Sequence, residues 1–330
     1  MSKKLKPKPK LAVASRKQPP RWQREKNISL VIWIVVPLII AAVLGLVGYW
    51  TYNNYVAAWG QPVLQVNEKT FDMDYLVKML RFYSGTQTES GQTPSAYQVL
   101  NTIEQQELTR QGAPALGLEA TPDEVNQAIR RFLGLAAAGN STEPPGQFEE
   151  TYQLLLDTTG LSDQECRDVF RGIVLAGNIT TYLKDTEVPT EAEQVHLQMI
   201  VVADEPTVQE LQDRIQQGED FSTLAEQYGT IEELKQAAGN LGWVPKGIYP
   251  ELDDVAFTLA LGNVSGPIQT DRGFCLVKVL DKADNMPIED TYRDILATNA
   301  LQQWLDQEKA ASDIKQYLDQ DKATWATNHI

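Results

Sequence analysis

Apolar residues follow three different patterns along the chain, and each pattern predicts a different kind of structure. Leu30–Trp50 is an apolar run that carries no formal charge. As a helix it would be about 31 Å long, enough to cross the roughly 30 Å hydrocarbon core of a bilayer. Residues 61–185 instead space their apolar side chains three or four positions apart, as amphipathic helices do. From Val195 onward, β-branched runs of strand length alternate with short helical stretches.

The helical region opens with a short alternating strand at Val63–Val66 and contains two well-marked helix starts. Thr121–Glu124 and Ser162–Glu165 each place a hydroxyl residue three positions before a glutamate, which is the arrangement of a capping box. Thr190–Glu193 is a weaker third instance of this spacing. The helix that starts at Ser162 carries Cys166 on its apolar stripe, which favours a core position over a reactive thiol.

After Pro189 the pattern changes to a mixture of strands and helices, which predicts a second domain. The predicted strands and helices there are Val195–Val202, Thr207–Gln217, Phe221–Tyr228, Glu251–Leu259, Gly262–Gln269 and Gly273–Leu280. Beyond Pro287 the apolar spacing is helical again. We expect this amphipathic tail to pack back on the helical region, because its apolar face needs a partner.

The predicted fold is therefore α+β with a single transmembrane helix. Its parts are a basic tail at 1–27, the transmembrane helix at 28–52, a helical domain at 61–187, a β-α-β domain at 190–284 and a C-terminal helix at 287–320.

The net charge of −15 hides a strong asymmetry between the two ends of the chain. Residues 1–27 hold ten Lys and Arg residues against Glu25 alone, so the remainder carries 19 basic and 43 acidic side chains, a net charge of −24. The acidic body is poorly suited to nucleic acid. Basic residues before a membrane span favour a cytoplasmic N-terminus, which places the acidic body outside the cytoplasm. The alternative is a signal peptide cleaved near Val56–Ala58, but the apolar run is longer than such segments usually are.

Cysteine and histidine are too few and too scattered for several kinds of site. Cys166 and Cys275 lie far apart, and His196 and His329 are the only histidines. Neither a disulfide framework nor a zinc site is predicted, and no metal or other cofactor is expected. A Ser-His-Asp or Cys-His hydrolase site is likewise not predicted.

Five motifs of the second domain occur in an order that resembles the parvulin-type (PPIC) prolyl isomerase domain. They are Gly218–Tyr228, Gly239–Trp243, Val255–Phe257, Gly262–Ile268 and Gly273–Phe274. The flanking helical segments resemble the chaperone regions of membrane-anchored bacterial extracytoplasmic foldases such as SurA, PrsA and PpiD. The resemblance covers most of residues 61–318. It implies a parvulin-like domain carried by a SurA-like helical chaperone region.

The resemblance also implies where the polar groups of the site belong. In that family an apolar pocket for proline is rimmed by two histidines and an Asp or Cys. The matching positions here are Met199 for the first histidine, Thr230 or Ile231 for the acid or cysteine, and Cys275 for the second histidine. All three polar positions are therefore replaced. His196 precedes Met199 by three residues, an odd offset that puts it on the opposite face of a strand unless the strand slips.

The apolar pocket itself, called here the proline cup, is retained better than its polar rim. The resemblance matches it to Ile248, Leu252 and Phe257, although ordinary core packing would also account for apolar residues at these spacings. Cys275 has two interpretations as well: a small buried hydrophobe, or a thiol that takes over part of the hydrogen bonding at the cup.

Two functions of different kinds follow from these observations. The first is an anchored peptidyl-prolyl isomerase that accelerates X–Pro isomerisation in exported proteins, with activity weakened or lost through the three replacements. The second is a non-catalytic holdase chaperone, in which the helical region cradles unfolded polypeptides and the parvulin-like domain binds peptide. Both predict unfolded, proline-containing polypeptides as partners.

Overall fold

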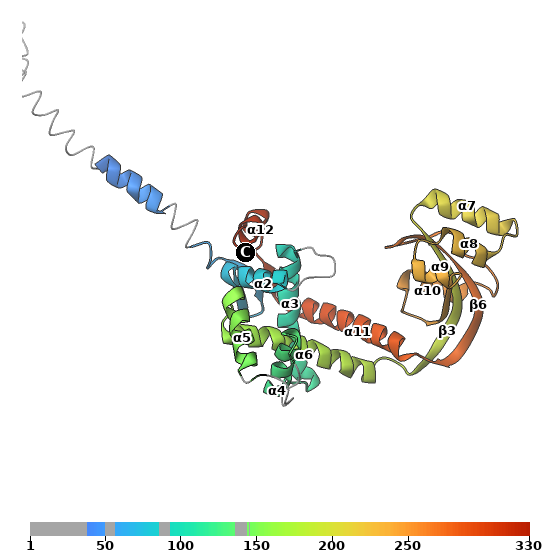
Figure 1. Ribbon diagram of the computed structural model, residues 1–330, viewed down its shortest axis with the longest axis horizontal. Coiled ribbons are helices and arrows are strands. Elements are labelled where there is room, and N and C mark those ends of the chain that lie inside the picture. Colours follow the sequence, from blue (N-terminus) through green and yellow to red (C-terminus); the bar gives the residue numbers. More distant parts are fainter. Residues whose placement is uncertain (1–37, 50–56, 86–92, 136–143, 145) are drawn as a thin grey trace, which may run out of the picture. The chain divides into compact units, whose positions relative to one another are not determined.

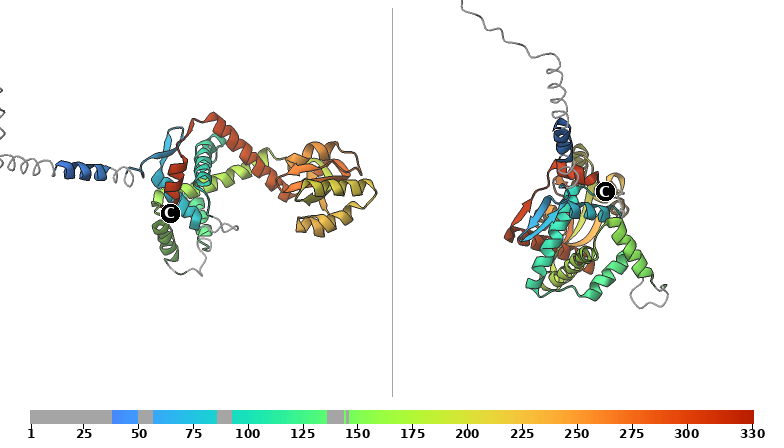
Figure 2. Two further views of the ribbon diagram at one scale, coloured as in Figure 1. Left: turned by 90° about the horizontal axis from the view of Figure 1, so that it is seen from above. Right: turned by 90° about the vertical axis from the view of Figure 1, so that its left-hand side faces the viewer.

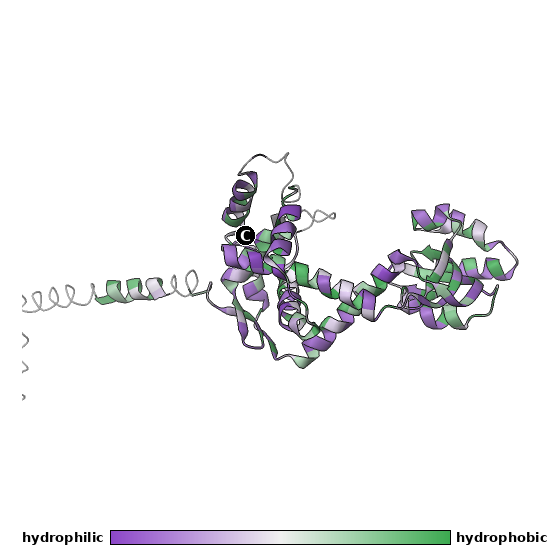
Figure 3. Cartoon of the chain, turned by 90° about the horizontal axis from the view of Figure 1, so that it is seen from below, coloured by the Kyte–Doolittle hydropathy of each residue, from purple (hydrophilic) through white to green (hydrophobic). Residues whose placement is uncertain are grey.

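The computed structural model describes residues 38–49, 57–85, 93–135, 144 and 146–330. Pro62–Ile330 forms one compact unit, and Met1–Gln61 forms another. Within the N-terminal unit, residues 38–49 are helical, exposed and mostly apolar (Figure 3). The rest of the predicted span Leu30–Trp50 lies outside the described residues. Across the part of the chain that is described, no helix is both long enough and apolar enough to cross a membrane.

The helical region of the larger unit contains a small sheet and a set of packed helices (Figure 1). Its elements before the second domain are β1 (Pro62–Val66), β2 (Lys69–Asp72), α2 (Met73–Gly85), α3 (Ala96–Gly112), the 3₁₀ helix η2 (Ala113–Leu116), α4 (Pro122–Phe132), α5 (Gln147–Thr159) and α6 (Asp163–Thr186). The core of this region is made of the apolar faces of these helices together with the inward side chains of β1.

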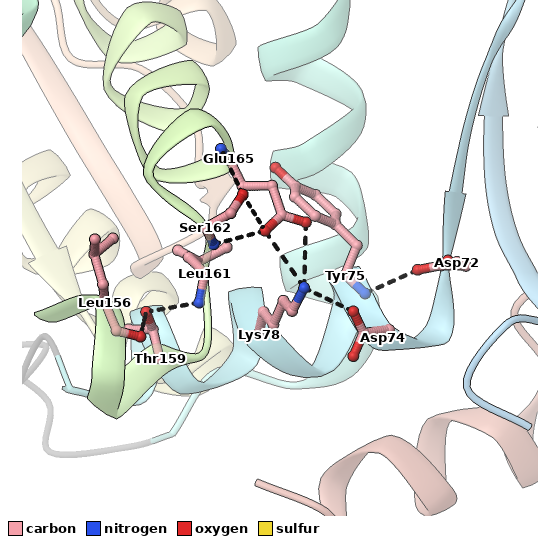
Figure 4. Close-up of polar contacts among 9 residues, drawn as sticks. All are labelled: Asp72, Asp74, Tyr75, Lys78, Leu156, Thr159, Leu161, Ser162 and Glu165. Atoms are coloured by element: carbon pink, nitrogen blue, oxygen red, sulfur yellow. Dashed lines mark hydrogen bonds and ion pairs between the residues drawn. The ribbon is translucent and has the colours of Figure 1, made fainter. Parts of the chain in front are cut away.

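Both predicted capping boxes are present. At the start of α6, the Ser162 amide donates to Glu165 Oε2 at 2.8 Å, and the Glu165 amide donates to Ser162 Oγ at 3.2 Å (Figure 4). The same carboxylate accepts from Lys78 Nζ of α2 at 3.3 Å, so the cap also ties two helices together. The second box, at Thr121, begins α4. Cys166 is fully buried, as its position on the apolar stripe predicts.

The C-terminal segment packs back on the helical region, but it is more elaborate than a single helix. Helix α11 (Asp290–Ala311) contacts α6 and α3 (Figures 1 and 2). The predicted helix at 287–320 is too long, because the backbone becomes extended at Ser312 and continues as β7 (Ile314–Gln316). This strand pairs antiparallel with β1 and completes a sheet of order β2-β1-β7, after which α12 (Gln320–Thr327) closes the chain.

Between α6 and α11 lies a separate α+β domain with an antiparallel sheet of order β4-β3-β6-β5. Its elements are β3 (Glu191–Val202), α7 (Glu205–Gln216), α8 (Phe221–Tyr228), α9 (Glu232–Gln236), β4 (Asn240–Pro245), α10 (Pro250–Thr258), β5 (Ile268–Thr270) and β6 (Gly273–Pro287). Helices α7 and α8 pack on one face of the sheet around Ile200, and α10 packs on the other. The helix start suggested by Thr190–Glu193 is wrong, because β3 already begins at Glu191 and its backbone pairs with the end of β6.

Candidate functional site

A cavity of about 580 Å³ opens on the α10 face of the sheet. Three parts of the domain line it: β3, the segment that runs from the end of β4 into α10, and the turn between β5 and β6. The lining residues are Met199, Val201, Ile248, Tyr249, Glu251, Leu252, Gln269, Thr270, Asp271 and Arg272. The floor is therefore apolar, and the polar side chains lie on the helix start and the turn.

Strand alternation decides which residues of β3 face this cavity. Met199 and Val201 pack in one cluster on the cavity side, whereas Ile200 and Val202 pack against α7 and α8 on the other side. His196 belongs to the second set. Its Nε2 lies 3.0 Å from Asn240 Oδ1, and its ring stacks on Trp243 of β4. His196 is thus held outside the cavity, as the odd offset from Met199 predicts.

The three positions matched to the family's polar groups lie together. Met199, Ile231 and Cys275 share one apolar cluster with Leu252, although they come from β3, the start of α9 and β6. Cys275 is fully buried, and burial raises the pKa of its thiol to about 12, with the charge of Glu251 adding to the effect. A thiol in this state is a small hydrophobe and not a nucleophile.

Thr230, the alternative to Ile231, has its hydroxyl committed to the backbone. Both its Oγ1 and its amide nitrogen donate to the Val201 carbonyl at 2.9 Å. The hydroxyl therefore fixes the chain after α8 against β3, next to the cavity floor.

Two of the three residues assigned to the proline cup line the cavity, and one does not. Ile248 and Leu252 face it, the first from the segment before α10 and the second from the first turn of α10. Phe257 packs instead against Val195 and Val279 in a neighbouring cluster, and it is not among the lining residues. It is half-buried beside the cup.

Sequence reasoning missed the polar residues of the cavity mouth, above all Arg272. This residue lies in the tight turn between β5 and β6, where its amide donates to Thr270 Oγ1 at 3.2 Å and Thr270 Oγ1 donates to the Gly273 carbonyl at 3.0 Å. Arg272 is the only cation among the lining residues, and a guanidinium offers five donors to a peptide carbonyl. A signal was present, since Arg272 directly precedes the matched motif Gly273–Phe274.

No group of three or more His, Cys, Asp or Glu side chains in the described ranges is placed to hold a metal ion. What the arrangement provides is an apolar floor with hydrogen-bond donors and acceptors at the mouth.

Comparison with known proteins places both parts of the chain. Residues 203–281 match the PPIC-type PPIASE domain model, and residues 21–179 match the model of the SurA-like N-terminal domain.

Among curated relatives, Foldase protein PrsA from Geobacillus sp. (strain WCH70) is 35% identical over 35% of this chain and 42% of its own. Foldase protein PrsA from Halalkalibacterium halodurans is 26% identical over 74% of this chain and 72% of its own. Periplasmic chaperone PpiD from Haemophilus ducreyi is 33% identical over 29% of this chain and 16% of its own.

The match spans about half the length or less of most of these relatives. A crystal structure of the peptidylprolyl isomerase PrsA from Bacillus anthracis aligns with 69% of this chain and 94% of its own, at 20% identity and a TM-score of 0.41.

The two family matches agree with the motifs that the sequence presents. The chain therefore carries a SurA-like N-terminal domain followed by a PPIC-type PPIase domain.

Proposed function

We propose that this protein is an extracytoplasmic folding factor whose PPIC-type domain binds X–Pro segments of exported polypeptides and isomerises them slowly. The observation that carries the proposal is the cavity beside Met199, which has an apolar floor and a hydrogen-bonding mouth at the position matched to the family's proline pocket. The foldase and periplasmic-chaperone names of the relatives support the same class of function.

The physical argument for slow catalysis starts from the amide bond. Rotation about X–Pro is opposed by amide resonance, with a barrier near ~20 kcal/mol, and uncatalysed exchange takes tens of seconds. The twisted amide has lost this resonance, so its carbonyl carries less negative charge than that of the planar form. An apolar floor therefore disfavours the planar forms more than the twisted one. Met199, Ile231 and Cys275 stand where the family has histidines and an acid or cysteine, and their apolar side chains add no polar contribution to this preference. We therefore expect the acceleration to be small.

A pair of isoleucine variants tests the cavity. Ile248→Ala removes apolar surface from the cavity wall, whereas Ile215→Ala removes the same atoms from the cluster on the opposite face of the sheet. Each lost methylene is worth about 0.8 kcal/mol of burial, so Ile248→Ala should weaken binding of a proline-containing peptide roughly tenfold or more. Equal affinity in both variants would exclude the cavity as the binding site. NMR exchange spectroscopy on the same peptide measures the isomerisation rate.

We propose in addition that residues 28–52 anchor the protein as a single span with the N-terminus in the cytoplasm. The ten basic residues before the span support this orientation. The corresponding division is a tail at 1–27, a helical chaperone domain at 61–187, a parvulin-like domain at 190–284 and a C-terminal segment from 287. Protease added to sealed inside-out vesicles should remove only the tail; digestion of the body would reverse the orientation.

The holdase function has an observation of its own. A second cavity of about 530 Å³ lies between α4 and α6 in the helical region, and its lining combines five apolar side chains, Phe132 and Ile173 among them, with five polar or charged ones. Phe132 and Ile173 remain 39% and 43% exposed there, and the Phe132 ring packs against Phe170 at 5.2 Å between centroids. Exposed aromatic and aliphatic surface in one groove suits unfolded chains, which present the same kinds of side chain.

Aggregation of an unfolded client separates this function from isomerisation. Phe132→Ser combined with Ile173→Ser should reduce suppression of aggregation and leave peptide isomerisation unchanged. Leu154→Ser is the matched control, because Leu154 is 63% exposed on α5 and does not line the groove. If the control is as defective as the groove variant, the groove has no special role.

A further inference from the structure

The wall of the proline cup is formed by a short segment that has no regular structure of its own. Lys246–Tyr249 connects β4 to α10, and its last two residues, Ile248 and Tyr249, line the cavity. The conformation of this segment therefore decides where two of the cavity's apolar groups lie.

Both backbone polar groups of Gly247 are bonded to side chains. Its amide donates to Asp253 Oδ2 of α10 at 2.9 Å, and its carbonyl accepts from Asn299 Nδ2 of α11 at 3.1 Å. One of these two partners thus comes from outside the PPIC-type domain, on the helix that follows it.

The same helix packs tightly against the segment. A Cβ atom at Gly247 would lie 3.1 Å from Leu296 Cδ2, closer than ordinary contact. Leu296 and Tyr292 also pack on the cluster that contains Ile248. Tyr292, Leu296 and Asn299 are spaced i, i+4 and i+7, so they form one stripe along α11.

The following part of α11 packs on the helical region. Ala300, Leu301 and Trp304 pack on a cluster that includes Leu175 and Ile179 of α6. Near its start, α11 is tied to the end of α6 through Lys184, whose Nζ lies 2.6 Å from Asp294 Oδ1 and whose carbonyl accepts from Arg293 Nη2 at 2.9 Å. The helix is thus held by contacts that do not involve the cavity.

We propose that Leu296 and Asn299 are positioning residues for the proline cup, through which the helical region sets the conformation of Lys246–Tyr249. This inference rests on the proposed function, because it assigns the cavity to peptide binding. It predicts that a cup without α11 is less ordered and binds proline-containing peptides more weakly.

Three variants of the full chain test it. Leu296→Ala removes the packing, and Asn299→Asp removes the hydrogen-bond donor with almost no change in shape. Leu301→Ala is the matched control, since it truncates the same residue type on the same helix in the cluster with α6. Asn299→Asp lies in a half-buried position, so it keeps the test available if Leu296→Ala fails to fold.

Two measurements give separate readouts. Hydrogen exchange followed by mass spectrometry reports the order of Lys246–Tyr249 directly, and fluorescence titration with a labelled Ala-Ala-Pro-Phe peptide reports binding. We expect Asn299→Asp to raise exchange in the segment roughly fivefold, the change expected for one lost hydrogen bond. Leu296→Ala should also raise exchange, through lost packing, and both variants should weaken peptide binding. The isomerisation assay should show this as a higher KM with little change in kcat.

Unchanged exchange in Leu296→Ala and Asn299→Asp would overturn the inference, and so would an equal increase in Leu301→Ala. Faster exchange without weaker peptide binding would mean that Leu296 and Asn299 order Lys246–Tyr249 but do not position the proline cup. A wild-type chain that binds no peptide would refute the proposed function instead, and the exchange comparison alone would then decide whether α11 holds the segment.

Discussion

Replacing Gly239 with alanine should destabilise the PPIC-type domain by about 2–4 kcal/mol, because this glycine is both left-handed and enclosed. Its φ is +78°, and an added Cβ would lie 2.8 Å from the Met199 carbonyl oxygen and 3.0 Å from Ala225 Cβ. Its carbonyl accepts from the Met199 amide at 2.8 Å, so the side chain cannot be accommodated without disturbing the strand that carries the cavity floor.

Gly262 separates the two contributions to this loss. It has the same φ of +78°, but no atom lies within 4 Å of the position its Cβ would take. Gly262→Ala should therefore lose only the free energy of a left-handed alanine backbone, about 1–2 kcal/mol. The reduced entropy of the unfolded chain offsets about 0.4–1 kcal/mol of this loss. Gly239→Ala adds the cost of overpacking, about 1–3 kcal/mol.

Hydrogen exchange of the β3 amides, measured over a range of urea concentrations, gives the free energy of opening of the domain in each variant. Gly239→Ala should lower this free energy by roughly 1–3 kcal/mol more than Gly262→Ala. Equal losses in the two variants would mean that β3 can move away from position 239, and the close packing of Met199 against this turn would not matter for stability.

Three further predictions concern charge and the replaced polar positions. Burial opposes ionisation of Glu165, but hydrogen bonds from Ser162 outweigh this effect and leave the pKa of the carboxyl below its usual value. The contribution of the carboxylate to stability is present above the unfolded pKa and is lost as pH falls through the folded pKa. Glu165→Gln should therefore flatten the fall in the urea midpoint of unfolding below about pH 4. Met199→His combined with Cys275→His should raise the isomerisation rate above wild type by NMR exchange at a cost of about 1–3 kcal/mol in unfolding free energy, and no gain would contradict the assigned register. Burial raises the thiol pKa of Cys166 to about 11 and that of Cys275 to about 12, so iodoacetamide at pH 8 should label neither cysteine in the native protein and both in urea, as mass spectrometry would show.

Local chemistry explains which parts of the fold could be predicted from sequence. A capping box needs only a hydroxyl and a glutamate three residues apart, so local sequence is enough to predict the starts of α4 and α6. Strand β7 is different, because Ile314–Gln316 has no pattern of its own and pairs with β1 from the other end of the described chain. Its position depends on non-local pairing, which sequence spacing does not encode.

The same distinction applies within the site. Strand alternation correctly separated Met199 from His196, because period two is a property of the strand itself. Helix periodicity could also have separated Phe257 from Leu252, since five residues turn an α-helix by about 140°. Arg272 could not be assigned in this way, because a turn residue faces a cavity only through the pairing of β5 with β6.

The division between floor and mouth sets a limit on what this cavity can catalyse. A donor such as Arg272 at the mouth can bond a proline-preceding carbonyl in both states, and it bonds the planar one at least as strongly because that oxygen carries more negative charge, so this contact raises affinity without raising rate. In the proposed function, the part of the site that distinguishes the two states is the apolar floor around Met199 and Leu252, which would act by excluding water. Arg272→Ala should therefore weaken binding, and reduce acceleration at subsaturating peptide, without lowering kcat. A polar residue introduced into the floor should instead change kcat. If Arg272→Ala lowered kcat and left KM unchanged, the guanidinium would bind the twisted amide preferentially, and the mouth rather than the floor would be the catalytic part of the site.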